Sequence, residues 1–377
     1  MHGRASRGNT AGVPNATERD PVATTETIAR WLGDHLDGAS NVTVTDLAAP
    51  PANGFSSETL LFQANWVAAN GERTERHMVI RVRPTAHSIF LDPDFSIQYK
   101  VTNALSLGSD VPLPPVHWFE DDPSWLGAPF YAMTKVEGLV PEDSPPYTFG
   151  GWVLDSTPDD QRRLWWSGIE AMAKVHKTDW QGLGLGFLDD SSRGAIGLDQ
   201  QLSYYRDFLT WAADGQSQPI PEAALERLKA TRPPEENLPA LCWGDARLGN
   251  MIFEDYTCRA VLDWEMTTLA QPELDLAWWL WFDRQFSEGL GVDRPAGFPS
   301  REETIDRYQE IIGREVRHME WYELFAGFRF SVVLVRLAAL LRSDNLLPVE
   351  SDFQTNNLCT QLLAKILGLP APSSTAD

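Results

Sequence analysis

The sequence predicts an α+β protein with two lobes, a small N-lobe built on an antiparallel sheet and a larger, mainly helical C-lobe. Two observations lead to this prediction. Short alternating and apolar runs, which are typical of strands, occur before residue 137, whereas the chain beyond residue 157 shows the apolar spacing of helices. We therefore expect a disordered leader at residues 1–22, the N-lobe at residues 23–136 and the C-lobe at residues 137–377.

The N-lobe contains one clear hairpin. Its expected elements, in chain order, are a helix at residues 24–36, strands at 60–66 and 77–83, a helix at 97–107 and a strand at 129–136. Asn70 and Gly71 provide a turn signal between the first two strands. On the second strand the period of two puts Arg81 and Arg83 on the face opposite Met78. Basic groups therefore occupy one face of this hairpin.

The C-lobe is expected to be a set of helices around one short hairpin. The helices are expected at residues 159–176, 202–211, 222–230, 305–312, 322–341 and 357–366. The hairpin pairs residues 251–253 with residues 259–262. A glycine-containing run starts at Gly182, but it follows a helix and has no Gly-Lys-Ser/Thr, so we interpret it as a connector.

Composition excludes several classes of function. The formal charge of −22 disfavours a nucleic-acid partner, because binding a phosphate backbone calls for a surplus of Lys and Arg. The three cysteines have no metal-ligand spacing, which favours a reducing compartment without disulfides. The N-terminal segment lacks the apolar core of a signal peptide, and we expect no membrane span. We therefore expect a cytoplasmic protein; the sequence does not indicate its oligomeric state.

The segment from residue 241 to residue 265 carries the chemistry. The hairpin described above brings the loop before its first strand close to the end of its second, so Asp245 and Asn250 are expected near Asp263. Two carboxylates and a carboxamide form a hard-oxygen site that suits Mg²⁺. The spacing Asp-x-x-x-x-Asn is that of the protein-kinase catalytic loop, in which Asp accepts the hydroxyl proton and Asn binds metal.

These motifs resemble the aminoglycoside phosphotransferase family, which has a protein-kinase-like fold. Gly244-Asp-x-x-x-x-Asn and Asp263-Trp-Glu match the motifs of that family. Arg247-Leu-Gly-Asn and Gln271-Pro-Glu-Leu-Asp are most similar to the branch related to the kinase domain fused to some acyl-CoA dehydrogenases. The resemblance covers about residues 25–345.

The resemblance implies transfer of the γ-phosphoryl group of ATP to a hydroxyl of a small molecule. It makes Asp245 the catalytic base and makes Asn250 and Asp263 the Mg²⁺ ligands. It also implies ATP-binding residues in a phosphate-covering loop, on a strand and in an adenine-binding hinge, namely Asn53, Gly54, Phe55, Ser56, Ser57, Arg81, Met133 and Lys135. Asp275 matches an aspartate that is structural in the family, and His176 is expected to be structural rather than catalytic.

Three positions depart from the family pattern. Trp243 replaces a histidine of the catalytic loop, Arg81 replaces the usual lysine, and Gln98 stands where a glutamate would pair with that cation. A catalytically inactive, nucleotide-binding or ligand-sensing protein is therefore the alternative. Glu265 could bind the metal or form a salt bridge in the loop, and both interpretations stay open. The acceptor is an aminoglycoside-like compound or a hydroxyacyl-type metabolite, and the nearby tryptophans lean toward the latter.

Overall fold

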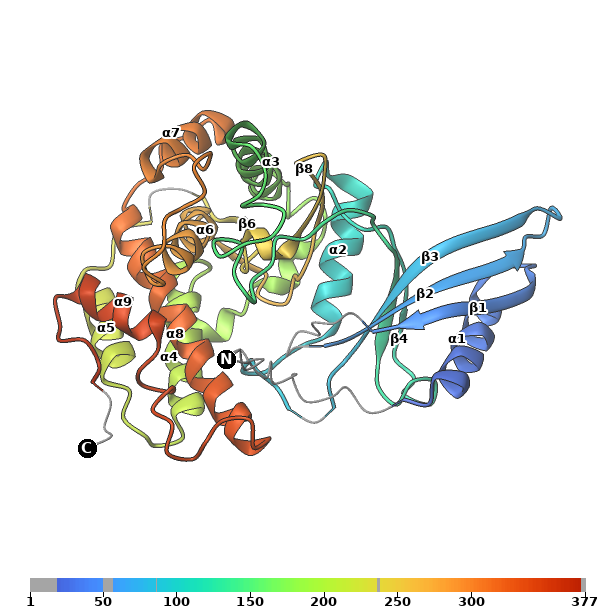
Figure 1. The fold of residues 1–377 in the computed structure, drawn as a ribbon, viewed down its shortest axis with the longest axis horizontal. Coiled ribbons are helices and arrows are strands. Elements are labelled where there is room, and N and C mark those ends of the chain that lie inside the picture. Colours follow the sequence, from blue (N-terminus) through green and yellow to red (C-terminus); the bar gives the residue numbers. More distant parts are fainter. Residues whose placement is uncertain (1–18, 50–56, 86, 236–237, 374–377) are drawn as a thin grey trace, which may run out of the picture.

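The computed structural model describes residues 19–49, 57–85, 87–235 and 238–373. Most of the expected leader and four residues of the expected phosphate-covering loop, Asn53, Gly54, Phe55 and Ser56, lie outside these described residues. In the described part the chain forms a β-rich N-lobe and a helical C-lobe, and Figure 1 shows them side by side. The predicted α+β class is confirmed.

The N-lobe is a five-stranded antiparallel sheet with the order β1-β2-β3-β5-β4. Its elements are α1 (Pro21–His35), β1 (Ser40–Ala48), β2 (Glu58–Val67), β3 (Arg73–Val82), α2 (Ser96–Gly108), β4 (Val116–Glu120) and β5 (Phe130–Thr134). β2 and β3 pair in unbroken register from Glu58 opposite Val82 to Val67 opposite Arg73, which places the connection at the predicted turn. The apolar face of the sheet packs on α1, where the Trp31 ring lies 4.9 Å from that of Phe130.

The C-lobe surrounds a second, larger core. Its helices are α3 (Pro158–His176), α4 (Leu198–Ala213), α5 (Pro219–Ala230), α6 (Glu273–Phe286), α7 (Arg301–Ile312), α8 (Met319–Ser343) and α9 (Leu358–Leu367). Two small sheets lie among them, β6 (Ala240–Cys242) with β9 (Thr268–Ala270) and β7 (Met251–Glu254) with β8 (Thr257–Val261). The β7–β8 pair is the predicted hairpin, and the two small sheets position the catalytic segment.

Helix α8 corrects the expectation that no segment approaches the length of a membrane span. Its 25 residues include a window with a mean hydropathy of 2.0, long and apolar enough to cross a membrane by length and composition. Of that window, 67% is buried inside the protein, as is usual for a core helix. α8 lies among α4, α5, α6 and α9 in Figure 1, so its apolar residues build the C-lobe core.

The structure also differs from the predicted boundaries in the N-lobe. The expected leader ends earlier, because Arg19 forms an ion pair with Glu58 at 2.8 Å and Asp20 caps α1 by accepting the Val22 N–H. β4 was not predicted, since its residues are all half-buried and follow a proline-rich stretch. Val101 and Leu105 of α2 pack into the larger core, so this helix joins the two lobes.

Candidate active site

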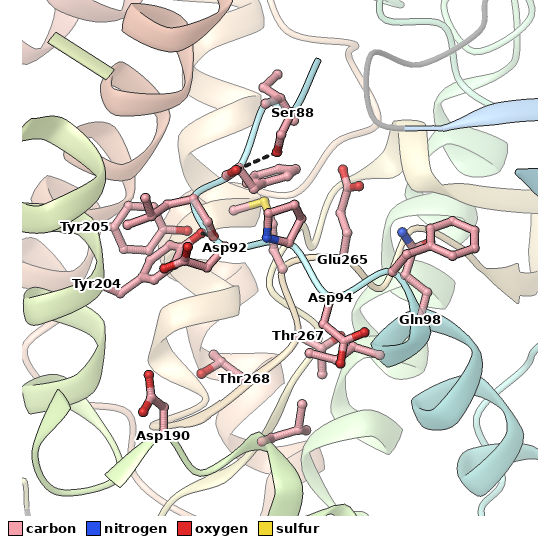
Figure 2. Close-up of a pocket in the computed structure, with 18 of the residues that line it drawn as sticks. Ser88, Asp92, Asp94, Gln98, Asp190, Tyr204, Tyr205, Glu265, Thr267 and Thr268 are labelled. Carbon is pink, nitrogen blue, oxygen red and sulfur yellow. Dashed lines mark hydrogen bonds between the residues drawn. The ribbon is translucent and has the colours of Figure 1, made fainter. Parts of the chain in front are cut away.

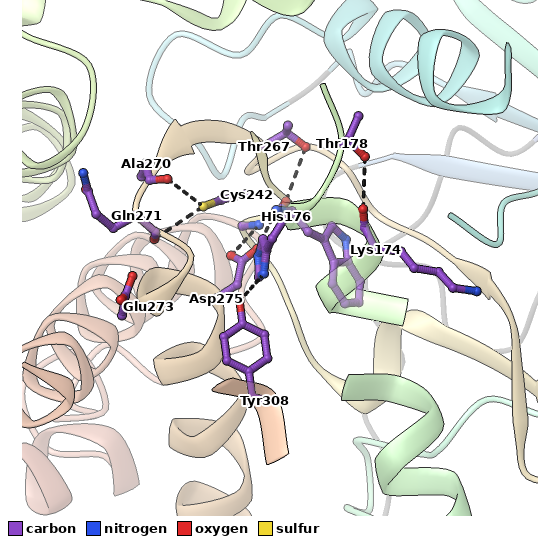
Figure 3. A network of polar contacts seen from close by, with 12 residues as sticks. Lys174, His176, Thr178, Cys242, Thr267, Ala270, Gln271, Glu273, Asp275 and Tyr308 are labelled. Carbon is purple, nitrogen blue, oxygen red and sulfur yellow. Dashed lines mark hydrogen bonds and ion pairs between the residues drawn. The ribbon is translucent and has the colours of Figure 1, made fainter. Parts of the chain in front are cut away.

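The carboxylate of Asp275 clamps the start of the catalytic loop. It is fully buried near the start of α6 and accepts the backbone N–H groups of Trp243 at 2.6 Å and Gly244 at 2.9 Å. His176 Nε2 lies 3.0 Å from the same carboxylate, and the Tyr308 hydroxyl lies 2.5 Å from His176 Nδ1, as Figure 3 shows. Both ring nitrogens of His176 are thus engaged in the protein interior, which fits the structural role predicted for Asp275 and His176.

Trp243 ties this loop to the end of the β7–β8 hairpin. Its buried indole Nε1 donates to the carbonyl of Leu262 at 2.7 Å and contacts that of Asp263 at 3.2 Å. The indole therefore bonds directly to the backbone of the expected metal ligand. The substitution of histidine by tryptophan keeps a hydrogen-bonding side chain at this position, and the loop geometry is held by it.

Gly244 makes the sharp bend before the expected base. Its φ of +94° is strained for residues with a side chain, and a Cβ atom there would clash with the Met266 carbonyl. The Gly244 carbonyl accepts a hydrogen bond of 3.0 Å from Nη2 of Arg329, a buried residue of α8. Both polar groups of this peptide segment are therefore fixed by the C-lobe.

Asp245 is held by three side chains. Its Oδ1 accepts from Trp278 Nε1 at 2.7 Å, its Oδ2 accepts from Asn250 Nδ2 at 2.6 Å, and Arg247 Nε lies 3.1 Å from both oxygens. The carboxylate is largely buried, with a side-chain exposure of 12%. Such charge-assisted hydrogen bonds fix the orientation of a carboxylate, which is what a base that aligns a hydroxyl requires.

Arg247 extends this network to the loop after the N-lobe. Its guanidinium forms a close ion pair with Asp143 and lies 5.3 Å from the Phe282 ring. Burial disfavours its charged form, but Asp245 and Asp143 outweigh this and raise the pKa of Arg247 above its usual range. Gly249 allows the close approach, since a Cβ there would meet both the Arg247 and Asp143 side chains.

Asp263 and Arg81 join the two lobes at the site. The Arg81 Nη2 atom lies 3.7 Å from Asp263 Oδ1. Burial raises the pKa of Asp263, against the opposing effect of Arg81 and with a further increase from Asp245. Burial would lower the pKa of Arg81, but the carboxylates of Asp263 and Glu265 contribute to a net increase. The phosphate-binding arginine of the prediction therefore lies beside the predicted metal ligand.

Gln98 does not serve as the charged partner of Arg81. The side-chain oxygen of this buried residue of α2 accepts from the Tyr131 hydroxyl at 3.2 Å. Burial raises the pKa of Tyr131 to about 12, so this phenol stays a hydrogen-bond donor. Among the described residues, Arg81 forms its salt bridge with Asp263 rather than with a residue of helix α2.

The residues present fit a Mg²⁺ ion. Asn250 directs its amide nitrogen to the Asp245 side chain and carbonyl, which leaves its Oδ1 as an oxygen ligand. Asp263 Oδ1 is buried and has no hydrogen-bond partner within the described part of the chain. A carboxylate and a carboxamide oxygen, completed by phosphate oxygens and water, are ligands that Mg²⁺ prefers.

The remaining predicted nucleotide contacts stay predictions. Ser57 is buried at the start of β2, and its hydroxyl has no hydrogen-bond partner among residues that the structure describes. Met133 lies in β5 and Lys135 directly follows it. The Lys135 N–H donates to the His77 carbonyl at 2.9 Å, and its ammonium group pairs with Glu137 at 2.8 Å.

A second cluster of metal-ligand types lies behind the loop. His176, Cys242 and Asp275 place one ligand atom each within 4.8 Å of one another. Burial raises the pKa of the Cys242 thiol well above its usual value, and the sulfur lies 3.5 Å from two backbone carbonyls that can accept its proton. Asp275 bonds both to His176 and to the N–H groups of the catalytic loop, and His176 also bonds to Tyr308, so the cluster is a hydrogen-bonding network.

A cavity of about 460 Å³ adjoins the site. It lies between the loop after β3, helix α4 and the residues that follow Asp263. Figure 2 shows Tyr204 and Tyr205 of α4 on one side of the cavity and Gln98 of α2 on the opposite side. Glu265 contributes to the wall nearest the metal ligand, and its carboxylate helps to raise the pKa of Arg81.

Sequence reasoning missed four residues of this site. Asp143, Arg247, Trp278 and Arg329 all bind the catalytic loop or the base. Arg247 lies between Asp245 and Asn250 in the catalytic-loop motif. Its positive charge two residues after Asp245 could have suggested that it pairs with the base. The other three come from distant segments, whose approach depends on the tertiary fold.

The two lobes and the site between them define a kinase-like phosphotransferase fold. A crystal structure of a putative aminoglycoside phosphotransferase from Ralstonia eutropha is similar over 91% of this chain and 98% of that one, with a TM-score of 0.67 and 21% identity. Aminoglycoside phosphotransferase APH(4)-Ia, in a ternary complex with AMP-PNP and hygromycin B, is similar over 91% of this chain and 98% of that chain, with a TM-score of 0.52 and 15% identity. These similarities show the fold.

The sequence profile described as the phosphotransferase enzyme family (APH) matches residues 50–311, and the chain belongs to that family. Human acyl-CoA dehydrogenase family member 11 is 28% identical over 298 residues, which cover 75% of this chain and 35% of the human protein. The Rattus norvegicus protein of the same name is 29% identical over 310 residues, 77% of this chain and 36% of that protein. The chain thus spans about a third of these relatives.

Proposed function

We propose that the protein transfers the γ-phosphoryl group of ATP to a hydroxyl group of a small molecule. The observation that carries this proposal is the convergence of Asp245 and Asn250, joined by a hydrogen bond of 2.6 Å, on a loop that Trp243 ties to Asp263. The bound AMP-PNP of the APH(4)-Ia complex supports the choice of nucleotide. The family supports the reaction class.

In this mechanism Asp245 orients the acceptor hydroxyl and accepts its proton as the new oxygen–phosphorus bond forms and the bond to ADP breaks. Asn250 and Asp263 would hold Mg²⁺, which would supply charge neutralisation for the phosphates when bound. Arg81 binds phosphate oxygens from the N-lobe side, and Ser57 donates its hydroxyl from the phosphate-covering loop. Trp278 and Arg247 keep the Asp245 carboxylate aligned, which lowers the entropic cost of reaching the transition state.

Adenine would bind at the hinge after β5, where Met133 and Lys135 were predicted to contribute. Because the Lys135 N–H is already donated to His77, Lys135 would contribute its carbonyl or its packing rather than its N–H. The acceptor is a hydroxylated small molecule, for which the sequence suggested aminoglycoside-like compounds or hydroxyacyl-type metabolites. The relatives named as acyl-CoA dehydrogenases support the second group.

A screen for ADP release tests the proposal. The panel contains aminoglycosides, macrolides, amino alcohols and hydroxyacyl thioesters, and mass spectrometry identifies the phosphorylated product. We expect acceptor-dependent ADP release that requires Mg²⁺. Tight Mg-ATP binding by calorimetry, combined with no turnover on any hydroxylated compound, would contradict the enzyme proposal.

That outcome would favour the alternative, a catalytically inactive protein that binds nucleotide or senses a ligand. Gln98 is the observation in its favour, because an active protein kinase pairs its phosphate-binding lysine with a glutamate at this helix. Asp263 takes the place of that partner for Arg81 here. Gln98→Glu tests whether this position is the cause: if the missing glutamate makes the protein inactive, the variant should gain transfer activity that the wild type lacks, whereas an active wild type excludes the alternative directly.

A further inference from the structure

We propose that the 460 Å³ cavity beside Glu265 binds the acceptor, and that it selects an uncharged hydroxylated body, such as a cyclic polyol or neutral sugar, over a polycation. The inference rests on the proposed phosphoryl transfer and specifies its substrate class. A volume of 460 Å³ lies within the usual range for small-molecule sites, about 300–1,000 Å³. Three features carry it: the position of the cavity, its uncharged interior and its charged rim.

The cavity shares a wall with the catalytic loop. Glu265 and Met266, two and three residues after Asp263, line it, and the Met266 carbonyl lies against Gly244 at the bend before the base. On the α4 side, Tyr205 lies 5.1 Å from the guanidinium of Arg329. A molecule in this cavity therefore lies against the segment that directly follows Asp263 and that packs on the bend before Asp245.

A chain of packed side chains also links the cavity to the base. The Arg329 guanidinium lies 4.5 Å from the Trp278 ring, and the Trp278 indole donates to Asp245. Arg329 is 1% exposed, and its Nε and Nη1 atoms have no hydrogen-bond partner among the described residues. Tyr205 at the cavity wall is thus joined to Asp245 through two rigid, buried side chains.

The buried part of the lining is uncharged. Three glutamines, Gln98, Gln200 and Gln201, are 3–7% exposed and contribute amide groups. Tyr205 is 3% exposed, and the half-buried Tyr204 donates its hydroxyl to the Leu91 carbonyl at 3.1 Å. Amides can bond to hydroxyl groups, and aromatic faces can pack on the carbon faces of a ring. This combination suits a neutral, hydroxylated ring.

The charged residues of the lining lie mostly at the rim and pair with one another. The side chain of Asp92 is 79% exposed and that of Asp190 is 52% exposed. Arg193 lies 3.0 Å from Asp190 and 2.7 Å from Asp207, and its cation lies 5.3 Å from the Tyr204 ring. These carboxylates already have a cationic partner, so they attract a second cation weakly.

This distribution of charge disfavours an aminoglycoside. Glu265 is the carboxylate on the inner wall, and its charge already acts on Arg81, whose pKa it helps to raise. An ammonium group carried among the buried glutamines and tyrosines would lose its water without a carboxylate among those side chains to replace it. A neutral polyol avoids that loss, because the carboxamide oxygens of Gln200 and Gln201 can accept its hydroxyl protons, while the amide nitrogens of these two residues already bond to Asp189, Gly194 and Thr268. Thr267 and Thr268 lie on the wall that follows the metal ligand.

Measuring how candidate acceptors bind in the absence of nucleotide tests the inference independently of phosphoryl transfer. Saturation-transfer NMR titrations would compare matched probes, glucose with glucosamine and cyclohexane-1,2-diol with 2-aminocyclohexanol, and would include kanamycin as the polycation. We expect each neutral probe to bind at least fivefold more tightly than its amine. Equal or tighter binding of the amines or of kanamycin, or no binding of either neutral probe, would overturn the assignment.

A charge-introducing variant locates the binding. Gln201→Glu places a carboxylate in the buried lining and should shift the neutral-to-amine preference at least fivefold toward the amine. Gln216→Glu is the matched control, an exposed glutamine just beyond α4, and should leave the ratio unchanged. Should Gln201→Glu fail to fold, Ser88→Asp on the opposite loop makes the same test. An unchanged ratio in a folded lining variant would overturn the proposal.

The two proposals fail in different ways. If neutral probes bind as expected but no hydroxyl compound supports ADP release, phosphoryl transfer is wrong and the binding site stands. If ADP release is found with polycations and Gln201→Glu has no effect on it, phosphoryl transfer stands and the cavity assignment is wrong.

Discussion

The base and the loop clamp of the active site differ from its predicted phosphate-binding groups in how fully their polar atoms are bonded. On the C-lobe side, Asp245 and Asp275 bind side chains and backbone groups on every oxygen. On the N-lobe side, the Ser57 hydroxyl and the Arg81 Nε are buried without a hydrogen-bond partner among the described residues. Buried polar groups of this kind are costly unless they serve a function.

This difference indicates that the base and the loop clamp are held in fixed positions by hydrogen bonds. Ser57 and Arg81, by contrast, keep hydrogen-bond donors that a bound nucleotide could use. The base is aligned by Trp278, Asn250 and Arg247 within the C-lobe. The contact between the lobes at the site is the Arg81–Asp263 pair, which at 3.7 Å is long for a hydrogen bond. Substitutions on the C-lobe side should therefore affect chemistry and folding, and those on the N-lobe side should affect nucleotide affinity.

Asp245→Asn should have the largest effect. An amide cannot accept the hydroxyl proton, so transfer should fall by about 10³-fold, within the range for a lost general base. Mg-ATP affinity, measured by calorimetry, should change less than threefold because Asn250 and Asp263 remain. A variant that keeps full transfer activity would remove the assignment of the base.

Asp275→Asn tests the rigidity of the C-lobe half. The amide would keep one acceptor and bring a buried donor against the Trp243 and Gly244 N–H groups, so the free energy of unfolding should fall by about 3 kcal/mol. Asp283→Asn is the control on the same helix, since Asp283 pairs with Arg294 at 2.8 Å and contacts no part of the loop. Chemical denaturation measures both. A larger loss for Asp283→Asn would show that the clamp is not the stabilising feature.

Arg81→Met tests the N-lobe half. Losing charge-assisted hydrogen bonds to phosphate should weaken ATP binding by about 10- to 100-fold. Arg76→Met is the control on the same strand, where the guanidinium lies 5.6 Å from the Trp66 ring. Calorimetry should find unchanged affinity in the control. If both variants bind ATP like the wild type, phosphate is held by other groups.

Trp243→Phe asks whether the link between loop and hairpin matters. The variant loses the indole donor to the carbonyls of Leu262 and Asp263, worth about 1 kcal/mol, and transfer should fall by about fivefold. Trp279→Phe removes a similar buried volume, but its Nε1 has no hydrogen-bond partner in the described chain. The control should therefore keep the activity. Equal activity losses would attribute the effect to packing alone.

Replacing Glu288, which lies outside the active site, should have the smallest effect, a small change in the free energy of unfolding. The hydrogen bond from Arg284, followed by Lys365, lowers its pKa to about 2. Because the folded pKa is below the ordinary value, its contribution to stability is present above about pH 4.5 and is lost as the pH falls toward 2. The side chain is 35% exposed, so the contribution is well under about 1 kcal/mol.

Thermal denaturation of Glu288→Gln across pH 2–7 measures that contribution. The difference from the wild type should shrink as the pH falls. A difference that grows at low pH would contradict the depressed pKa.

Much of the site could be predicted because its residues lie within one short segment. Asp245, Asn250 and Asp263 are joined by a hairpin whose strands are visible in the sequence, and the structure pairs those strands as expected. The other helices were predicted from their apolar spacing, but α6, which carries Asp275 and Trp278, was not among them. The bounds shifted by a few residues, as at α1, where Asp20 rather than a threonine supplies the cap.

The rest depends on contacts between distant segments. Strands β6 and β9 are three residues long and show too little alternation to be recognised. Asp143 reaches the base through Arg247 across 104 residues of sequence, and no local pattern predicts that pair. The role of Trp243 could not be inferred from residue type, since its indole acts through two backbone carbonyls that only the fold brings near.

Metal-dependent nucleotide binding tests the central claim most directly, because it needs no knowledge of the acceptor. Mn²⁺, used in place of Mg²⁺ and followed by electron paramagnetic resonance in the presence of ATP, would be titrated against the wild type, Asp263→Asn and Asp245→Asn. We predict bound Mn²⁺ in the wild type and in Asp245→Asn, and a loss of at least tenfold in affinity in Asp263→Asn. Undiminished Mn²⁺ and ATP binding by Asp263→Asn would contradict the account.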